Sequence, residues 1–528
     1  MLHFIPAWYA DDSWSEQEQS WYSRRMHTEF DDTVKHVQLF HRNRIAPFEI
    51  MLLSYAPNFR HFLHRQGVYH APYWSCFDAI QSISRKKAAL LSYHNLKWPE
   101  GTEFLYTMFA VVAMRNGQKY AQIEFGEDGN LIRIDLYEGG CLRRKNLYDD
   151  RGFVSSTIIY QQGMPYYQDY LDEGGNWRIR RFFQDGHVQV NPQFPNFRLE
   201  RWGCVWELPF RSQRYDSLEQ VIAEVVREYI GRGSERDIFC AALHPLHMPL
   251  IERVFRNKRL ILSVFEGRWD MEDNAFIQAL GAARHLICDS QQSLRLLQKH
   301  GKEKLPNCTV ITPFDSRPDF GKSQQTTSQK ILVPVDGLKP EVFKWLAVAL
   351  GQYLLENPDA QLYLFTREAT YGLEQKLLQQ VRGFLEEAGL PWLQVPQEKQ
   401  EQTENAEPVK SLSQRCFAQQ CVDELAVSRC LRQQRLIVDF RNVRDVYLRI
   451  VAISMGIPQI LLYPSEFVVS GKNGIVLTSP RSLFEALRYY LDELANWNRA
   501  MVCAYEIGKQ FDTKTQVENW KGVLDSFE

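Results

Sequence analysis

The sequence predicts an α/β protein in which two doubly wound domains of the Rossmann type face a cleft, with an antiparallel β-sheet inserted into the first domain. Apolar strands alternate with amphipathic helices over residues 237–312 and again over 331–511, a pattern typical of parallel sheets with helical crossovers. Over residues 116–186, glycine-containing turns recur every 10 to 13 residues, which indicates an antiparallel meander. The length of 528 residues suits two or three domains.

The N-terminal domain is expected to be discontinuous, over residues 1–100 and 200–316. Apolar runs bounded by turn residues predict its strands, and the periodic spacing of apolar residues predicts its helices. Ser217 is expected to cap the helix that reopens the domain. The expected strands lie over 2–5, 48–53, 237–242, 259–264, 285–288 and 309–312, and the expected helices over 33–41, 56–65, 217–230, 248–256, 274–283 and 290–300.

The inserted sheet is expected over residues 101–199. Its turns include Asn116-Gly117 and Asp128-Gly129, dipeptides that suit positive backbone φ. The chain is rich in large aromatic residues, with 13 Trp, 24 Tyr and 31 Phe, and a share of them falls in this sheet, which predicts that it forms part of an interface. The expected strands lie over 109–113, 118–125, 131–137, 156–160 and 177–183.

A polar linker over 317–329 is expected to lead into the C-terminal domain, which we place at residues 317–505. A last helix within residues 506–528 is expected to pack back on the N-terminal domain. The stretch 396–413 is rich in Gln and Glu and predicts a surface loop. The expected strands lie over 331–335, 361–365, 435–440, 459–462 and 475–477, and the expected helices over 341–355, 373–387, 445–455, 482–497 and 499–511.

The composition excludes several classes of function. A net charge of −2 gives no electrostatic basis for bulk nucleic-acid binding. No apolar run approaches the length of a membrane span, and no signal peptide is recognisable at the N-terminus, so we expect a cytoplasmic protein. None of the ten cysteines forms a C-x-x-C pair, and His244-Pro-Leu-His247 lacks a third ligand, so neither a metal nor a cofactor is expected.

Two stretches resemble the GT-B glycosyltransferases. The first runs from Asp237 through Cys288-Asp289-Ser290 to Asp315 and is similar to the second half of a GT-B N-terminal domain. The second, Gly456-Ile-Pro458 followed by Gly471-Lys-Asn-Gly474, is similar to the nucleotide-sugar region of the C-terminal domain. On its own, the Gly-x-Pro only indicates the end of a helix. The resemblance implies a ligand site in the cleft between the two domains.

The sequence departs from that family at its donor site. The resemblance puts the two glutamates of retaining enzymes at Val443 and Val451, on the helix that Gly456 ends. Valine cannot hydrogen-bond a sugar hydroxyl. Residues 336–339, Asp-Gly-Leu-Lys, replace the family's basic diphosphate site, and Pro6-Ala-Trp-Tyr9 replaces its glycine-rich loop. These departures predict a protein that is not an enzyme.

The N-terminal run Phe4-Ile-Pro-Ala-Trp-Tyr9, combined with the inserted sheet, resembles the family of the first accessory secretory protein in the accessory Sec system of Gram-positive cocci. The resemblance covers the whole chain. It implies a cytoplasmic subunit that can be peripheral at the membrane through the secretion complex. The implied partners are the second and third accessory secretory proteins, the accessory Sec motor ATPase and a glycosylated serine-rich repeat adhesin whose export the complex assists.

Seven residues are candidates for contacts with a ligand or partner in the cleft, because each follows a strand or lies in a turn opposite one. Trp8 and Tyr9 could instead pack on the first helix. Two alternative functions remain open: an active GT-B glycosyltransferase that uses Asp289, Lys339 or Lys472, and a glycan-binding module. The seven candidates are Trp8, Tyr9, Asp289, Ser290, Lys472, Asn473 and Gly474.

Overall fold

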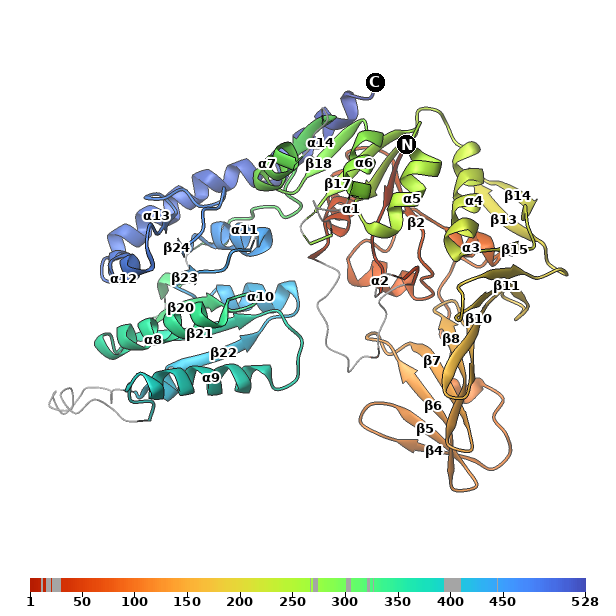
Figure 1. Ribbon diagram of the computed structural model, residues 1–528, viewed down its shortest axis with the longest axis horizontal. Coiled ribbons are helices and arrows are strands. Elements are labelled where there is room, and N and C mark those ends of the chain that lie inside the picture. The colour runs from red at the N-terminus through yellow and green to blue at the C-terminus, as the bar shows by residue number, and fades with distance from the viewer. Residues whose placement is uncertain are drawn as a thin grey trace.

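The computed structural model describes the chain except for residues 11–12, 16–19, 21–29, 266, 269–273, 301–304, 321–322, 326, 394–409 and 444. Two parallel α/β sheets lie in separate lobes, and an antiparallel sheet extends from the N-terminal lobe away from both (Figure 1). The predicted α/β class is confirmed. Most of the predicted loop over 396–413 lies outside the described residues.

The N-terminal lobe contains a seven-stranded parallel sheet in the order β19-β18-β17-β16-β1-β2-β3. The four residues of β1 are all buried, and successive side chains point to opposite faces. Phe4 and Ile50 therefore join one hydrophobic cluster, and Ile5 and Met51 join another. The strands are β1 (Leu2–Ile5), β2 (Phe48–Leu52), β3 (Tyr73–Ser75), β16 (Ile238–Ala242), β17 (Arg259–Val264), β18 (His285–Cys288) and β19 (Asn307–Val310).

Helices cover both faces of this sheet. The last helix, α14 (Thr513–Asp525), returns from the end of the chain to the N-terminal lobe (Figure 1). Its Trp520 is fully buried and packs edge-on against Phe4 and Phe40, with ring centroids 5.8 and 4.9 Å apart. The other α-helices are α1 (Asp32–Asn43), α2 (Phe59–Arg65), α3 (Cys76–Ile80), α4 (Leu218–Gly231), α5 (Met248–Leu250), α6 (Asn274–Ala282) and α7 (Gln291–His300).

The inserted sheet has ten antiparallel strands, in the order β15-β12-β11-β10-β9-β8-β7-β6-β5-β4. It continues past residue 199, where the insertion was expected to end, because β15 (Arg214–Tyr215) pairs with β12. A separate hairpin is formed by β13 (Asn196–Arg201) and β14 (Cys204–Pro209). The other strands are β4 (Thr102–Tyr106), β5 (Val111–Arg115), β6 (Gln118–Phe125), β7 (Leu131–Glu138), β8 (Cys141–Asp149), β9 (Phe153–Gln161), β10 (Met164–Leu171), β11 (Trp177–Phe182) and β12 (Val188–Val190).

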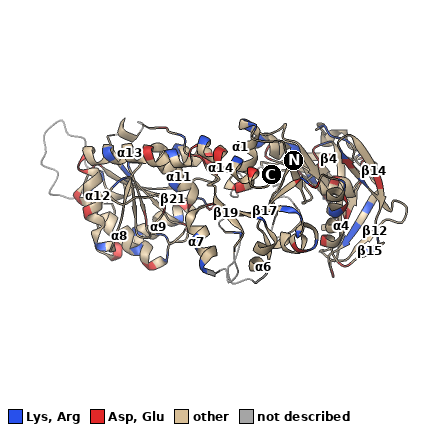
Figure 2. Cartoon of the chain, turned by 90° about the horizontal axis from the view of Figure 1, so that it is seen from above, with Lys and Arg blue, Asp and Glu red and all other residues tan. Residues whose placement is uncertain are grey.

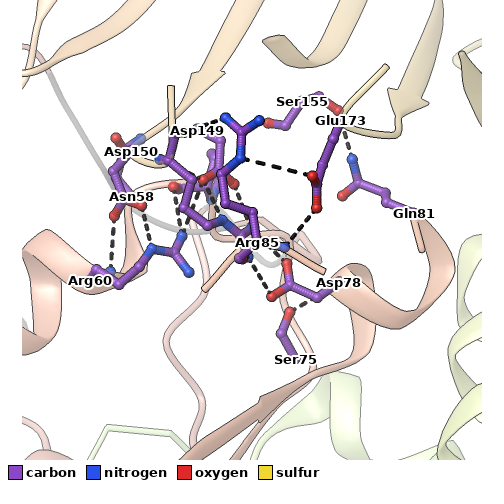
Figure 3. A network of polar contacts seen from close by, with 12 residues as sticks. Asn58, Arg60, Ser75, Asp78, Gln81, Arg85, Asp149, Asp150, Ser155 and Glu173 are labelled. Atoms are coloured by element: carbon purple, nitrogen blue, oxygen red, sulfur yellow. Dashed lines mark hydrogen bonds and ion pairs between the residues drawn. The ribbon is translucent and has the colours of Figure 1, made fainter. Parts of the chain in front are cut away.

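A buried cluster of ionised side chains anchors the inserted sheet to the N-terminal lobe (Figure 3). Arg60 of α2 bonds the side chain of Asp150, in the turn between β8 and β9. Arg151 of the same turn makes two bonds of 2.8 Å to Asp78 of α3 and two of 2.7 Å to Asp149. Both guanidiniums are almost completely buried, and each faces carboxylates, as burial of a charge requires.

The C-terminal lobe contains a six-stranded parallel sheet in the order β22-β21-β20-β23-β24-β25. Gly456, at φ 69°, ends α11 in the left-handed conformation, as predicted. The strands are β20 (Gln329–Pro334), β21 (Ala360–Thr366), β22 (Cys416–Gln420), β23 (Leu436–Asp439), β24 (Gln459–Leu461) and β25 (Gly474–Val476), and the helices are α8 (Pro340–Glu356), α9 (Leu373–Glu387), α10 (Glu424–Leu431), α11 (Val446–Met455), α12 (Leu483–Leu491) and α13 (Leu494–Gly508).

Several secondary-structure predictions differ from the structure. The expected helix over 248–256 is the short α5 followed by a π-helix over Ile251–Phe255, a distortion that apolar periodicity does not reveal. The expected helix over 482–497 breaks at Glu493, whose extended backbone starts α13. Strand β22 and helix α10 were not predicted, because their apolar patterns are too short to stand out from the polar segment before them.

Candidate functional site

A small cavity lies in the cleft between the two lobes, with a volume of about 260 Å³. It opens at the carboxyl ends of the strands, where doubly wound folds place ligands. The N-terminal lobe contributes residues at the start of α7, and the C-terminal lobe contributes the loop before α11 and the loop after β24. The lining residues are Ser290, Gln292, Arg441, Asn442, Val443, Asp445, Val446, Arg449, Tyr463, Pro464, Ser465, Glu466 and Phe467.

Glu466 of the C-terminal lobe occupies the N-terminus of α7 in the N-terminal lobe. Its two carboxylate oxygens accept hydrogen bonds from the backbone N–H groups of Gln291 and Gln292, at 2.9 and 2.8 Å. The free N–H groups and the dipole at a helix N-terminus form an anion site. Burial, together with nearby Asp289, raises the pKa of Glu466 above its ordinary value despite these bonds.

Two buried arginines line the C-terminal side of the cavity, and each is neutralised within its own lobe. Arg441 makes bonds of 2.9 and 2.8 Å to Asp439 and one of 3.1 Å to Asp445. Arg449 bonds Asp439 at 2.5 Å and Gln459 at 2.9 Å. Burial alone would raise the pKa of Asp439, but Arg449 and Arg441 outweigh it, and the pKa lies below its ordinary value.

Asp445 holds the N-terminus of α11 in the same way that Glu466 holds that of α7. Its carboxylate caps the helix by accepting the N–H of Leu448 at 3.1 Å, and it also bonds Arg367 at 2.8 Å. Burial opposes ionisation of Asp445, but the charges of Arg367 and Arg441 dominate and lower its pKa strongly. The chain's own carboxylates thus lie at both helix N-termini that face the cavity.

The comparisons with known proteins point to one family, over nearly the whole chain. One family model matches residues 1–526 of the chain. It describes the first accessory secretory protein, a protein of the accessory Sec system. The chain belongs to this family. A member from Streptococcus gordonii is 31% identical over 537 residues, and one from Staphylococcus aureus is 29% identical over 538 residues; each alignment covers 99% of both chains. The family resemblance read from the sequence is confirmed.

Solved structures give the same result for the fold. A chain of the Streptococcus pneumoniae structure of accessory secretory proteins 1, 2 and 3 has a TM-score of 0.78 and 27% identity, with full coverage of both chains. A chain of the Gap123 complex from Streptococcus agalactiae has a TM-score of 0.75 and 30% identity, covering 98% of this chain and 99% of that one. The pneumococcal O-GlcNAc transferase GtfA, at 11% identity, has a TM-score of 0.69 and covers 100% and 98%. The predicted GT-B-like fold is confirmed.

Of the two valines predicted at the glutamate positions of retaining GT-B enzymes, only Val443 lines the cavity. Val443 is 41% exposed. It precedes α11, which begins at Val446, so the prediction that it lies on the helix is wrong. Val451 lies on α11 and packs partly buried against a hydrophobic cluster. The Asp336-Gly337 turn, predicted to replace the diphosphate site, lies beside Val443. A Cβ atom added to Gly337 would be 3.4 Å from Cγ1 of Val443.

Trp8 and Tyr9 do not line the cleft, in contrast to the prediction. The Trp8 indole donates to Asp31 at 3.0 Å and packs against Phe62, with the ring centroids 4.8 Å apart. The Tyr9 hydroxyl lies 2.6 Å from Nε2 of His247. Both side chains are buried, at 6% and 4% exposed. The aromatic residues after β1 fill the interior of the N-terminal lobe because α1 and α2 close over that strand end.

Of the other predicted residues, Ser290 lines the cavity, Asp289 is buried without lining it, and the remaining three lie in or next to a turn. The Ser290 hydroxyl donates to Asp289 at 3.0 Å. Asn473 is 1% exposed and closes a turn, accepting from the N–H of Val469 at 2.8 Å and donating to the carbonyl of Phe467 at 2.9 Å. Lys472 is exposed, and Gly474 begins β25. None of these last three lines the cavity.

Sequence reasoning missed four charged residues that define the cavity. Arg441 and Asp445 follow β23 directly, and charged residues after a parallel strand were a usable signal. Arg449 is hidden by its position in an apolar helix, and Glu466 lies in a loop with no periodic pattern. Within the described part of the chain, no group of three or more His, Cys, Asp or Glu side chains could hold a metal ion. The four residues are Arg441, Asp445, Arg449 and Glu466.

Proposed function

We propose that this chain is a subunit without glycosyltransferase activity that assists export of a glycosylated serine-rich repeat adhesin from the cytoplasm. It would bind the second and third accessory secretory proteins and present the adhesin to the accessory Sec motor ATPase. One observation carries the proposal: the chain's own carboxylates occupy the anion positions of the cleft. The family membership and the valines at 443 and 451 support it.

The electrostatics of the cleft oppose binding of a nucleotide sugar. A diphosphate at the start of α7 would meet the Glu466 carboxylate, which already accepts the two N–H groups there. Two like charges about 4 Å apart cost about 4 kcal/mol at the effective dielectric of a protein surface. Arg441 and Arg449 would offer no compensation, because Asp439 and Asp445 already neutralise them.

The size of the cavity supports the same conclusion. Its volume of about 260 Å³ falls below the range of about 300–1,000 Å³ that is typical of small-molecule sites. A charged donor would have to displace Glu466 and separate the lobes before it could enter. We infer that the GT-B architecture serves in this chain as a scaffold for assembly.

The free edge of the inserted sheet suits a partner protein. Strand β4 has one neighbour among the described strands, β5, and Leu105, Tyr106 and Met108 at its end are 52%, 68% and 81% exposed. Charged side chains, especially Lys, and Pro usually protect an edge, and of these β4 carries only Glu103. The opposite edge, β15, is only two residues long and carries Arg214. We propose that a strand of another accessory secretory protein pairs with β4.

Surface charge favours a protein partner over nucleic acid. Basic and acidic side chains are interspersed over helices α8, α9 and α12 (Figure 2), in agreement with the net charge of −2. Such a surface produces no extended positive field to attract a phosphate backbone. In the part of the chain that the structure covers, no helix is both long and apolar enough to cross a bilayer.

The experiment combines assembly and chemistry in one sample. The intact chain is mixed with its two partner proteins, recovered by affinity capture, and assayed for transfer of GlcNAc from UDP-GlcNAc to a serine-rich peptide. We expect a stable complex and no transfer. Tyr106→Lys should weaken recovery of the partners at least tenfold, whereas Tyr371→Lys, at a fully exposed tyrosine of the C-terminal lobe, should not. Sugar transfer by the complex would refute the proposal.

A further inference from the structure

A second cavity lies on the side of the N-terminal lobe away from the cleft. It has a volume of about 350 Å³ and lies between the first residues of strands β2 and β3 and the β13–β14 hairpin. Because doubly wound enzymes bind their substrates at the opposite, carboxyl ends of the strands, this cavity is separate from the site inherited with the fold. Lys86, Arg198, Glu200 and Trp202 are among its lining residues.

A ladder of planar side chains supports one wall of this cavity. Trp74 stacks on Tyr229, with ring centroids 4.0 Å apart. The guanidinium of Arg201 lies 4.7 Å from the Tyr229 ring and 4.5 Å from the Trp202 ring. Arg201 is itself fixed, because it bonds the Tyr229 carbonyl at 3.1 Å and the carboxylate of Asp237. Trp202 is therefore the outermost, braced member of a rigid stack.

Trp202 is an energetically unfavourable residue at its position. It is 64% exposed and has φ 50°, a left-handed conformation that L-residues other than Asn, Asp and Gly avoid. It occupies the first central position of a two-residue hairpin turn, followed by Gly203 at φ 77°, where asparagine is the favoured residue. A large, strained indole held out into solvent contributes little to folding, which points to a role in binding.

The charged side chains around the cavity define the ligand. Acidic and basic side chains are equal in number. A lining with no net charge disfavours a phosphate, a nucleotide or a strongly charged peptide. The acidic side chains are Glu49, Asp78 and Glu200, and the basic ones are Lys86, Arg198 and Arg201. The ammonium group of Met1, which also lines the cavity, is paired with Asp237 at 3.3 Å.

Two of these side chains are placed to bond a ligand's hydroxyl groups. Arg198 and Glu200 approach each other only to 4.0 Å, which is beyond hydrogen-bonding distance. Lys86 bonds one carboxylate oxygen of Glu200, Oε1, and the other oxygen faces Arg198. A guanidinium supplies donors and a carboxylate oxygen supplies an acceptor, so the pair can bond hydroxyl groups of either polarity.

We propose that this cavity binds a neutral saccharide, with one sugar face resting on the Trp202 indole and the hydroxyl groups bonded by Arg198 and Glu200. A sugar ring combines an apolar C–H face with a rim of uncharged donors and acceptors, which matches an exposed aromatic ring beside paired charges. The inference goes beyond the proposed function, because assembly of the secretion complex does not require it. The saccharide is either free or carried on a serine residue of a peptide, and the test distinguishes the two.

The test measures binding of N-acetylglucosamine, and of a serine peptide carrying it, to the full chain by saturation-transfer NMR. We expect both probes to bind, and UDP not to displace them. Trp202→Asn should weaken binding at least tenfold while leaving the melting temperature unchanged or higher, because asparagine suits the turn. If Trp202 had only a structural role, the substitution would not weaken binding while leaving the melting temperature unchanged or higher. Trp345→Asn, at a half-exposed tryptophan of the C-terminal lobe, is the matched control.

Each outcome of this test either supports or refutes binding of a saccharide in the cavity. Binding of the peptide-linked sugar alone would assign the site to a glycosylated protein, and binding of both probes would assign it to the sugar itself. If neither probe binds, or if Trp202→Asn binds as the unchanged chain does, the proposal is wrong. Such a failure leaves the proposed function intact provided that the chain still joins its partner proteins, so the two can be separated.

Discussion

Buried histidines in the N-terminal lobe couple the stability of the protein to pH. His247 is 1% exposed, and its two ring nitrogens lie 2.6 Å from the Tyr9 hydroxyl and 2.6 Å from the Ala242 carbonyl. Burial lowers its pKa to about 3 and that of His36 to about 4. Both side chains are therefore neutral in the folded protein, whereas histidine in the unfolded chain takes up a proton near pH 6.5.

Acid should therefore destabilise the fold through these groups. As pH falls from about 6.5 towards 4, the unfolded state gains protons that folded His247 does not bind, which costs up to about 1.4 kcal/mol of stability per pH unit. His247→Gln keeps a donor and an acceptor but removes the titration. We expect a shallower loss of stability with acid in chemical denaturation from pH 7 to 4. An unchanged profile would contradict this account, and His70→Gln, at an exposed histidine, is the control.

Gly474, a predicted site residue, should matter for folding rather than for binding. A Cβ at this position would collide with the Gln459 carbonyl of the neighbouring strand and come within 2.6 Å of Val468. Overpacking of this kind costs about 1–3 kcal/mol. Gly474→Ala should lower the melting temperature measured by calorimetry by several degrees, whereas Lys472→Ala, at the exposed neighbour, should not. Equal melting temperatures would show that the strand moves to accommodate the methyl group.

At the scale of elements, the sequence predicts regular strands and helices well. Strands 259–264 and 285–288 and helix 373–387 are found with the predicted bounds, because buried parallel strands are continuous apolar runs and surface helices are periodic. Strands β8 and β10 of the insertion were missed. Their exposed faces carry charged and aromatic residues such as Arg143 and Tyr166, which break the alternation expected of a strand.

The candidate site was less predictable, for a physical reason. The cavity depends on contacts between residues far apart in sequence, such as Glu466 with Gln291 and Arg367 with Asp445. Neither pair produces a recognisable pattern among neighbouring residues in the sequence. The same holds for Trp8, whose burial depends on how α1 and α2 pack. The valines at 443 and 451 were accessible only through resemblance to a family, because an aliphatic side chain has no chemical signature of its own.

The ion cluster of the β8–β9 turn should decide how firmly the inserted sheet is attached. Arg60→Met removes the partner of Asp150 and leaves a buried carboxylate beside Asp149. Loss of one partner of a buried ion pair costs about 3–5 kcal/mol. Hydrogen exchange of the amides in this turn should accelerate markedly. Combining Arg60→Met with Asp150→Leu should restore part of the protection.

A control on the same sheet isolates the effect of burial. Arg143 pairs with Glu138 at 3.5 Å, but both side chains are more than half exposed, and exposed pairs contribute little to stability. Arg143→Met should therefore leave hydrogen exchange unchanged. If it destabilises the sheet as much as Arg60→Met does, the buried cluster is not the anchor.

At the scale of the whole molecule, side chains of both lobes hold the cleft closed. In addition to Glu466, Lys35 of α1 bonds Glu424 of α10 at 2.6 Å. Phe314 packs edge-on against Tyr447 of α11, with ring centroids 4.9 Å apart. Relative domain motion is the usual behaviour of interfaces between domains.

Removing these bonds should open the molecule. In the double variant Glu466→Ala, Lys35→Ala, the start of α7 loses its acceptor and α1 loses its ion pair across the cleft. A loss of about 1.4 kcal/mol raises the open population tenfold, which small-angle scattering would detect as a larger radius of gyration. Lys344→Ala, which breaks the 2.7 Å pair with Glu387 inside the C-terminal lobe, should leave the radius unchanged. No expansion in the double variant would mean that apolar contacts alone keep the lobes together.

The central claim is that the cleft of this family member is filled by its own carboxylates and no longer binds a sugar donor. Calorimetric titration of the intact chain with UDP-GlcNAc tests it most directly. We predict no measurable heat for the unchanged chain, and weak binding at most for Glu466→Ala, which vacates the start of α7. Saturable, tight binding of UDP-GlcNAc by the unchanged chain would contradict the account.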